Sequence, residues 1–297
     1  MVTHVLLVGL CTVDVVQRVD EIPGPGEKVQ ARAVDLAAGG PAANAAVAVA
    51  TLGGRPTLVT SLGTHPLAEL ARADLHACGV RVVDLTPTRV EPPPVSAVLV
   101  REHDGERSVV SRSAADIVAP PAPDLLADLV DDAGAVLLDG HHPAPTMSAA
   151  RAARRAGVPV VLDAGSWKPV LDELLPLVDV CACSGVFTVP DDDDVFAGLH
   201  RRGVPVVTRT NGPEPVLWSA DGLRGAVPPP AVPVQDTVGA GDVWHGGLAF
   251  GVARLRRVPR ATELPELVAE ANRLAGIRVS YAGPRTWVEP ARAALCT

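Results

Sequence analysis

The sequence reads Asp236-Thr237-Val238-Gly239-Ala240-Gly241-Asp242 at the point that decides the fold, with an acid at each end of a glycine-rich turn. Apolar residues at helical spacing follow over residues 243–253, so the turn opens a helix and Asp242 belongs in or just before its first turn. A short extended run is predicted just before it, at Val232 to Val234. A capping role for Thr237 or Asp242 would explain one polar residue, but not two acids around Gly-Ala-Gly. Glycine lets the backbone N–H groups converge and the helix dipole adds positive potential, so the segment predicts a phosphate site beside a proton acceptor.

Length and composition indicate a globular protein with a substantial core. Its 297 residues suffice for one large α/β domain or two small ones with a substantial core. Apolar residues make up 47% and aromatic residues 3%, which predicts a core of aliphatic side chains.

Charge and cysteine content exclude several classes of partner. The net charge is −8 and no cluster of Lys and Arg occurs, so we expect no nucleic acid partner. The apolar stretch 1–11 is too short to span a membrane and lacks a basic leader, so it predicts a first strand and no membrane partner. Five cysteines without framework spacing favour free thiols and a cytoplasmic location.

Short apolar runs alternate with segments of helical pattern along most of the chain. Unalternated runs of Val and Leu are typical of strands buried on both faces of a parallel sheet. We expect an α/β fold with a largely parallel sheet and helices on both faces. The expected strands are Val5 to Leu10, Thr57 to Ser61, Val80 to Leu85, Ala135 to Asp139, Val158 to Asp163, Val178 to Cys183 and Val204 to Thr208. The expected helices between them are Ala42 to Leu52, Pro66 to Cys78, Pro123 to Asp132, Pro145 to Ala156, Lys168 to Leu175 and Asp192 to Arg202.

Three segments depart from this pattern. Lys28 to Leu36 and Val95 to Ser113 alternate polar and apolar residues, and His103 to Glu106 is a turn within the second. Alternation predicts strands with one face in water, either as an ordinary edge hairpin or as a small β lid over a cleft. A late hairpin is predicted over residues 216–227.

A second constellation begins at Gly39 and Gly40 and continues as a helix of small residues in which Asn44 is the long polar side chain. Glycines allow close approach of a ligand, and an amide that donates and accepts suits hydroxyl recognition. The alternative is an Asn that satisfies a neighbouring loop.

The two motifs, in this order, resemble those of the ribokinase-like (PfkB) family of carbohydrate kinases. The wording around them is also similar to the sulfofructose kinase branch of that family. The resemblance implies a three-layer sandwich with a mostly parallel central sheet and a small β lid. It implies a single domain over residues 1–297 with lid strands within about 15–36 and 95–113. Asp242 corresponds to the catalytic base, and the amides of Gly239, Ala240 and Gly241 to the anion hole.

The resemblance also assigns binding residues. Asp14, Gly39, Gly40 and Asn44 match positions that hold the sugar. His141 follows a predicted strand at the sheet edge where ligands bind, although a loop histidine without a role is the plain alternative. For ATP the candidates are Thr208, Asn211, Asp236, Thr237 and Asn272. ATP and Mg²⁺ are the implied cofactors, the metal ligands are unknown, and Asp236 is either structural or part of a monovalent-cation site of the type some relatives use.

Two segments differ from the family pattern. Ser184 to Phe187 stands where relatives have Asn-x-x-Glu, and Thr208 to Pro213 lacks the glycines of Thr-x-Gly-x-x-Gly. Magnesium can still be held by ATP phosphates and water. We therefore expect transfer of the ATP γ-phosphoryl group to a sugar hydroxyl. The alternatives are a nucleoside kinase of the same fold and a non-catalytic sugar-binding or regulatory descendant. A homodimer through the lid is a further expectation from the family.

Overall fold

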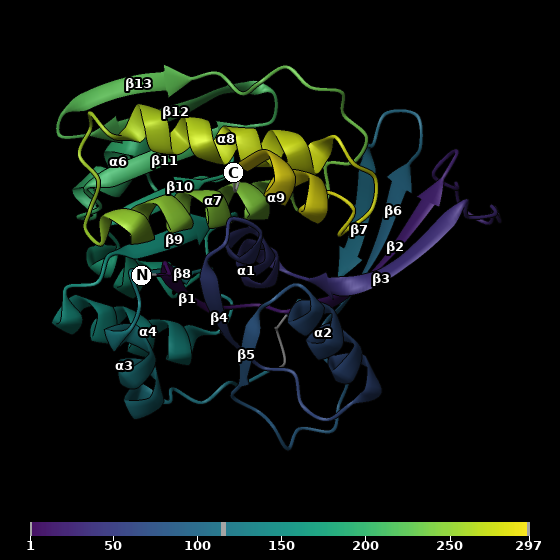
Figure 1. Ribbon diagram of the computed structural model, residues 1–297, viewed down its shortest axis with the longest axis horizontal. Helices are drawn as coiled ribbons and strands as arrows, with labels where there is room; N and C mark the ends of the chain where they lie inside the picture. Colours follow the sequence, from purple (N-terminus) through teal and green to yellow (C-terminus); the bar gives the residue numbers. More distant parts are fainter. Residues whose placement is uncertain (1, 114–116, 296–297) are drawn as a thin grey trace.

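The computed structural model describes residues 2–113 and 117–295, which form two sheets of unequal size (Figure 1). The larger has nine strands in the order β13-β12-β11-β10-β9-β8-β1-β4-β5. Neighbours from β11 to β5 run parallel, and β12 and β13 are antiparallel. The strands are β1 (His4–Val8), β4 (Arg55–Thr60), β5 (Arg81–Asp84), β8 (Ala135–Leu138), β9 (Val160–Ala164), β10 (Val180–Cys183), β11 (Val206–Asn211), β12 (Glu214–Ala220) and β13 (Leu223–Val227).

Burial on both faces explains the unalternated apolar strands. In β1, Val5 and Leu7 pack into one core cluster, whereas Leu6 and Val8 pack into a second cluster on the other face. Successive side chains of a strand point to opposite faces, so a strand between two helical layers must be apolar throughout.

Helices cover both faces of the large sheet, which gives three layers (Figure 1). The cluster that contains Val5 is covered by α1 (Pro41–Thr51), α2 (Pro66–Ala77), α7 (Ala240–Leu255), α8 (Leu264–Val279) and α9 (Val288–Leu295). The opposite cluster is covered by α3 (Pro123–Asp131), α4 (Pro143–Ala156), α5 (Leu171–Leu174) and α6 (Val195–Arg201). Within the described residues, no helix is both long and apolar enough to cross a membrane.

The smaller sheet has four strands in the order β3-β2-β6-β7 and projects from one side of the body (Figure 1). Its strands are β2 (Thr12–Val19), β3 (Ala33–Gly39), β6 (Val95–Arg101) and β7 (Arg107–Ser111). Alternation in β6 is visible as burial, because Ser96, Val98 and Val100 are buried while the residues between them are more exposed.

The expected α/β architecture is confirmed, with local differences at two segments that contain proline. Val232 to Val234 forms no strand, because Pro233 interrupts it and lacks an N–H for a ladder. The helix expected over Lys168 to Leu175 is only α5 followed by a 3₁₀ turn, Leu175–Leu177, in which Pro176 cannot donate to an α-helical bond.

Candidate active site

A cleft of about 470 Å³ lies between the small sheet and the edge of the large sheet where its parallel strands end. Ser96, Val98, Arg107 and Val109 line it from the small sheet. Asp163, the penultimate residue of strand β9, lines it from the large sheet. Ligands of open α/β sheets bind at this edge, outside the carboxyl ends of the strands.

The start of α7 forms one wall of the cleft. Gly239 is the N-cap residue with φ 69°, a left-handed conformation that glycine adopts without strain. Among the described residues, no side chain caps this helix. The Ala240 N–H donates to the Thr237 carbonyl over 3.3 Å, whereas the N–H groups of Gly239 and Gly241 have no partner among the described residues and can bind an anion. Gly239, Ala240, Gly241 and Asp242 all line the cleft, as the sequence motif predicts.

Asp242 lies in the first turn of α7 and is partly accessible through the cleft. The Nδ2 group of Asn44 donates a hydrogen bond to its Oδ2 atom over 2.9 Å. Burial and then the charge of Asp163 raise the pKa of Asp242, and although the Asn44 hydrogen bond and His245 act in the opposite direction, the pKa is raised to about 7. A carboxyl group with such a pKa can accept a proton near neutral pH.

Asp163 and His245 form a buried pair beside Asp242. The Nδ1 atom of His245 lies 2.8 Å from Oδ2 of Asp163, and polar atoms of these two residues and Asp242 all lie within 4.8 Å of one another. Burial would lower the pKa of His245, but the Asp163 carboxylate outweighs burial and raises it. The Asp163 carboxylate thus favours the protonated form of the imidazole, which lies close to both acids.

Most of the predicted sugar-binding residues also line the cleft. Asp14, Gly40 and Asn44 line it, and the Thr12 hydroxyl donates to Oδ1 of Asp14 over 2.6 Å. Gly39 does not line it but lies directly under Asp14, where a Cβ atom would come within 1.9 Å of the Asp14 carboxylate. Burial raises the pKa of Asp14, although hydrogen bonds from Thr12 and Ser96 oppose this effect.

His141 also lines the cleft, beside the buried Asp139. Its Nδ1 atom lies 3.2 Å from Oδ1 of Asp139. Oδ1 of Asp139 accepts the His141 N–H, and Oδ2 accepts the Leu10 N–H. Burial would raise the pKa of Asp139, but the charge and hydrogen bonds of His141 and the Leu10 amide hold it below its usual range.

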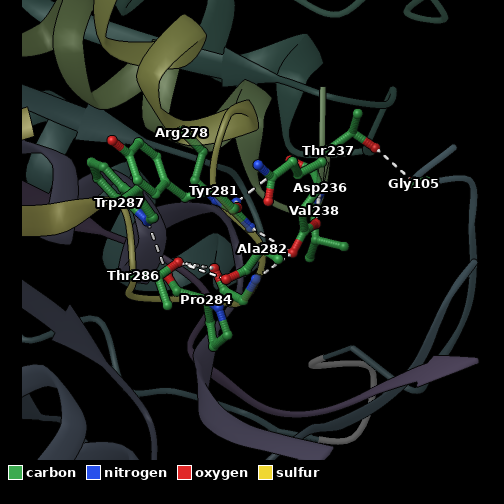
Figure 2. A network of polar contacts seen from close by, with 12 residues as sticks. Gly105, Asp236, Thr237, Val238, Arg278, Tyr281, Ala282, Pro284, Thr286 and Trp287 are labelled. Carbon is green, nitrogen blue, oxygen red and sulfur yellow. Dashed lines mark hydrogen bonds and ion pairs between the residues drawn. The ribbon is translucent and has the colours of Figure 1, made fainter. Parts of the chain in front are cut away.

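Asp236 and Thr237 lie behind and beside the glycine turn. Asp236 is 1% exposed, and its carboxylate accepts the N–H groups of Val238 and Gly283. Thr237 lines the cleft and accepts a hydrogen bond from Arg107 of β7 over 2.7 Å. It also donates to the Gly105 carbonyl, a contact drawn in Figure 2. The turn is thus attached to the small sheet.

Comparison with known proteins identifies the family of this chain. A family model described as pfkB family carbohydrate kinase matches residues 2–292. The chain belongs to the pfkB family of carbohydrate kinases. The family membership and kinase class expected from the sequence are therefore confirmed, and so is the ribokinase-like fold.

Individual relatives in the pfkB family agree with this assignment. Ribokinase from Arabidopsis thaliana is 30% identical over 271 residues, covering 84% of this chain and 69% of the relative. An ATP-dependent ribose-1-phosphate kinase from Halopiger xanaduensis is 29% identical, covering 82% and 83%. The structure of the Arabidopsis ribokinase complexed with ribose and ATP superimposes with a TM-score of 0.75 at 26% identity, covering 98% of this chain and 99% of that one.

Three residues that the pfkB family pattern assigns to ATP lie outside the lining of the described cleft. Thr208 is fully buried in β11, and Asn211 is exposed at the end of that strand. Asn272 is buried between helices, where it accepts from Trp244 Nε1 over 2.7 Å and donates to the Val227 carbonyl. Their assignment to ATP stays a prediction.

The sequence analysis did not single out Asp163 or Asp139. Asp139 directly follows β8 and Asp163 is the penultimate residue of β9, and a single acid at the carboxyl end of an apolar strand is a signal for a site residue. Arg107 and Lys168 were also missed, although both line the cleft and bring positive charge to it. Their signal was weak, because isolated basic residues in exposed segments are common.

Proposed function

We propose that this pfkB-family kinase transfers the γ-phosphoryl group of ATP to a sugar hydroxyl, with Asp242 as the general base. The observation that carries the proposal is the position of Asp242, which faces the cleft from the first turn of α7 with a pKa of about 7. The N–H groups of Gly239 and Gly241, together with that of Ala240 once it turns from the Thr237 carbonyl, would stabilise charge on the transferring group.

Asp14, Gly40 and Asn44 would orient the acceptor, with Gly39 leaving room for the Asp14 carboxylate. Asn44 would contact both the acceptor and the general base, since its side chain already donates a hydrogen bond to Asp242. His141, which also lines the cleft, would contact a second part of the sugar. Hydroxyl groups between Asp14 and Asp242 would be held at the base, which lowers the entropic cost of the reaction.

ATP would bring Mg²⁺ on its phosphates, because the place of the family's Asn-x-x-Glu motif holds Ser184 and Phe187 and offers no carboxylate. The Ser184 hydroxyl donates to the Gly165 carbonyl. Thr237 would border the phosphates together with Arg107 and Lys168, which supply positive charge. Since ATP and reduced thiols are typical of the cytoplasm, a cytoplasmic location accompanies the proposal.

The small sheet would act as a lid and as a dimer interface. Its inner face carries Ser96 and Arg107 into the cleft, and closure would exclude water as a competing acceptor. Its outer face carries an apolar row in which Leu36, Val15, Ala97 and Val110 are successive cross-strand partners. Leu36 is 51% and Val110 77% exposed. An apolar row of this kind suits a second copy of the chain.

A screen for phosphoryl acceptors tests the proposal. Ketoses, pentoses, sulfosugars and nucleosides are each incubated with ATP and Mg²⁺, and ADP and the phosphorylated product are both quantified. The expected result is stoichiometric ADP and sugar phosphate with at least one sugar. Preference for nucleosides would replace the sugar assignment. Sugar binding without any phosphorylated product would overturn the kinase proposal in favour of a binding protein.

A further inference from the structure

A cluster of oxygen atoms beneath the glycine turn has the composition of a cation site. Segments 235–238 and 281–284 lie side by side there, next to the end of α8 (Figure 2). The cluster contains the buried Asp236 carboxylate and the carbonyl groups of Gln235, Asp236 and Tyr281. Carboxylate and carbonyl oxygens are the usual ligands of hard cations.

Two guanidinium groups of the chain contact these oxygens. Arg278, which is 3% exposed, donates from Nη1 to the Tyr281 carbonyl over 3.1 Å and to the Asp236 carbonyl over 3.5 Å. Its Nη2 atom lies 3.5 Å from Oδ2 of Asp236 (Figure 2). Arg18, from β2 of the small sheet, approaches the same Oδ2 atom to 3.5 Å and donates to the Gln235 carbonyl over 3.2 Å.

The charges of this cluster are balanced without an added ion. Arg18 also pairs with Glu102 over 2.8 Å, so two guanidinium groups face two carboxylates, Asp236 and Glu102. Burial lowers the pKa of Arg278, but the Asp236 carboxylate opposes this effect and a guanidinium stays protonated at neutral pH. A metal cation would have to displace Arg278 from its oxygen ligands and would face uncompensated positive charge.

The cluster is connected directly to the candidate active site. Oδ1 of Asp236 accepts the Val238 N–H over 2.9 Å, and Val238 precedes Gly239 at the start of α7. A cavity of about 20 Å³, the size of one water molecule, is lined by Asp236 and Arg278 as well as by Asn44 and Gly239. The charge on Asp236 therefore fixes the backbone that presents the N–H groups to the phosphoryl group.

We propose that Arg278 is a built-in cation that positions the anion-binding turn and makes the enzyme independent of monovalent metal ions. Arg278 is a positioning residue, since it contacts the Asp236 segment and not the reacting groups. The residues present do not fit a monovalent metal ion. The kinetic part of this inference rests on the proposed kinase function, whereas the binding part does not.

The test compares the wild-type protein with Arg278→Ala, which opens space at the oxygen cluster, and with Arg278→Lys, which keeps the charge. Arg273→Ala is the matched control, because Arg273 is an exposed residue of the same helix. Turnover and the thermal midpoint are measured in KCl, in choline chloride at equal ionic strength, and in choline chloride with guanidinium at concentrations too low to denature. Thermal midpoints report ion binding without requiring any activity.

We expect wild-type kcat to agree within about a factor of two between KCl and choline chloride, because no metal ion binds one state preferentially. Arg278→Ala should lose about tenfold or more in choline chloride through displacement of the turn. K⁺ or guanidinium should restore much of that loss and raise the midpoint of this variant alone. Arg273→Ala should behave as wild type.

Severalfold activation of the wild-type enzyme by K⁺ would overturn the inference, and so would full activity of Arg278→Ala in choline chloride. If Arg278→Ala does not fold, the inference is tested by comparing the wild-type protein in KCl and in choline chloride. The Arg278→Lys variant, which keeps the charge, is expected to show the same turnover in both salts. If no acceptor is phosphorylated, the proposed function fails separately, and a K⁺-dependent midpoint of the wild-type protein would still count against the built-in cation.

Discussion

Asp14, Asp139, Asp163 and Asp242 line the same cleft, and the surroundings of Asp14, Asp139 and Asp242 give these three different proton affinities. Bound amides and His141 hold the pKa of Asp139 below its usual range, burial raises that of Asp14, and burial beside Asp163 raises that of Asp242 to about 7. Titratable groups whose pKa values are moved apart in one site are typical of an acid–base division of roles. Asp242 is the member of the set suited to accept a proton at neutral pH.

The pKa of Asp242 predicts a pH dependence of turnover. The base must be deprotonated, so kcat/KM should be constant above about pH 7 and fall about tenfold for each pH unit below it. Replacement Asp163→Asn removes a charge that raises this pKa, so the acidic limb should move to lower pH. The measurement is kcat/KM from pH 5 to pH 9.

The control is Asp172→Asn, on helix α5 and outside the cleft lining, which should leave the limb unchanged. A wild-type rate that is independent of pH down to pH 5 would contradict a base with the pKa of Asp242. An unchanged limb in Asp163→Asn would mean that Asp163 does not act on the base.

Individual site residues could be predicted from the sequence where their role depends on the local backbone. Residues whose role depends on a partner far along the chain were missed. Asp242 and the N–H groups around it belong to one turn, so seven residues sufficed to predict them. The pair of Asp163 and His245 joins β9 to α7, 82 positions along the chain, and no local pattern predicts such a contact. The role of Asp236 stayed open for the same reason, because Arg18 and Arg278 reach it from other elements.

Helix α7 packs against α1 and, in the proposed function, also presents the anion-binding turn, and two of its glycines separate these roles. A Cβ atom at Gly246 would lie 2.5 Å from the Ala45 carbonyl of α1, whereas one at Gly241 meets no protein atom within 4 Å. Gly246→Ala should therefore destabilise the fold by about 1–3 kcal/mol through overpacking. Gly241→Ala should keep the stability and lose about 10²-fold in kcat/KM, because the methyl group displaces the phosphoryl group.

Thermal unfolding and steady-state kinetics of the two variants check this prediction, and each variant is the control for the other. Loss of stability in Gly241→Ala, or full kcat/KM with ATP in that variant, would contradict the assignment of its surroundings to a ligand.

Helices and strands could be predicted from the sequence where all residues of a segment are buried in the same way. The strands of the large sheet are apolar on both faces, so runs such as that of β8 were recognised directly. Segments near proline were predicted less well, as at Pro233 and Pro176, because a missing N–H changes the structure without changing the apolar pattern. In β3 the strand begins only at Ala33, although alternation starts at Lys28.

At the scale of the molecule, the outer face of the small sheet predicts self-association. Val110 is 77% exposed in the row shared with Val15 and Leu36, so Val110→Lys would bury charge in a dimer. We expect the dimer to weaken on the order of 100-fold, as for an uncompensated buried charge. Light scattering with size-exclusion chromatography measures the mass over a range of protein concentrations.

Leu223→Lys is the matched control, since Leu223 is 56% exposed on β13 of the other sheet. It should leave the mass unchanged. A wild-type protein that stays monomeric at all concentrations would contradict the proposed interface.

The shape of the cleft could not be predicted from the sequence, because the cleft forms where the two sheets meet. Asp14 is on β2 of the small sheet, Asn44 on α1 and Asp242 on α7, and only the assembled layers bring them to one cavity. The order of the motifs allowed these residues to be grouped through the family, but their contacts, such as the bond from Asn44 to Asp242, required coordinates.

The most direct test of the account is the replacement Asp242→Asn, which removes the proton acceptor and keeps the size of the side chain. The dissociation constants of acceptor and ATP should change by less than about threefold, whereas kcat should fall by roughly 10²- to 10⁴-fold. Isothermal titration and single-turnover kinetics measure the two quantities on the same preparation. Near-wild-type turnover with unchanged binding would contradict the assignment of Asp242 as the base.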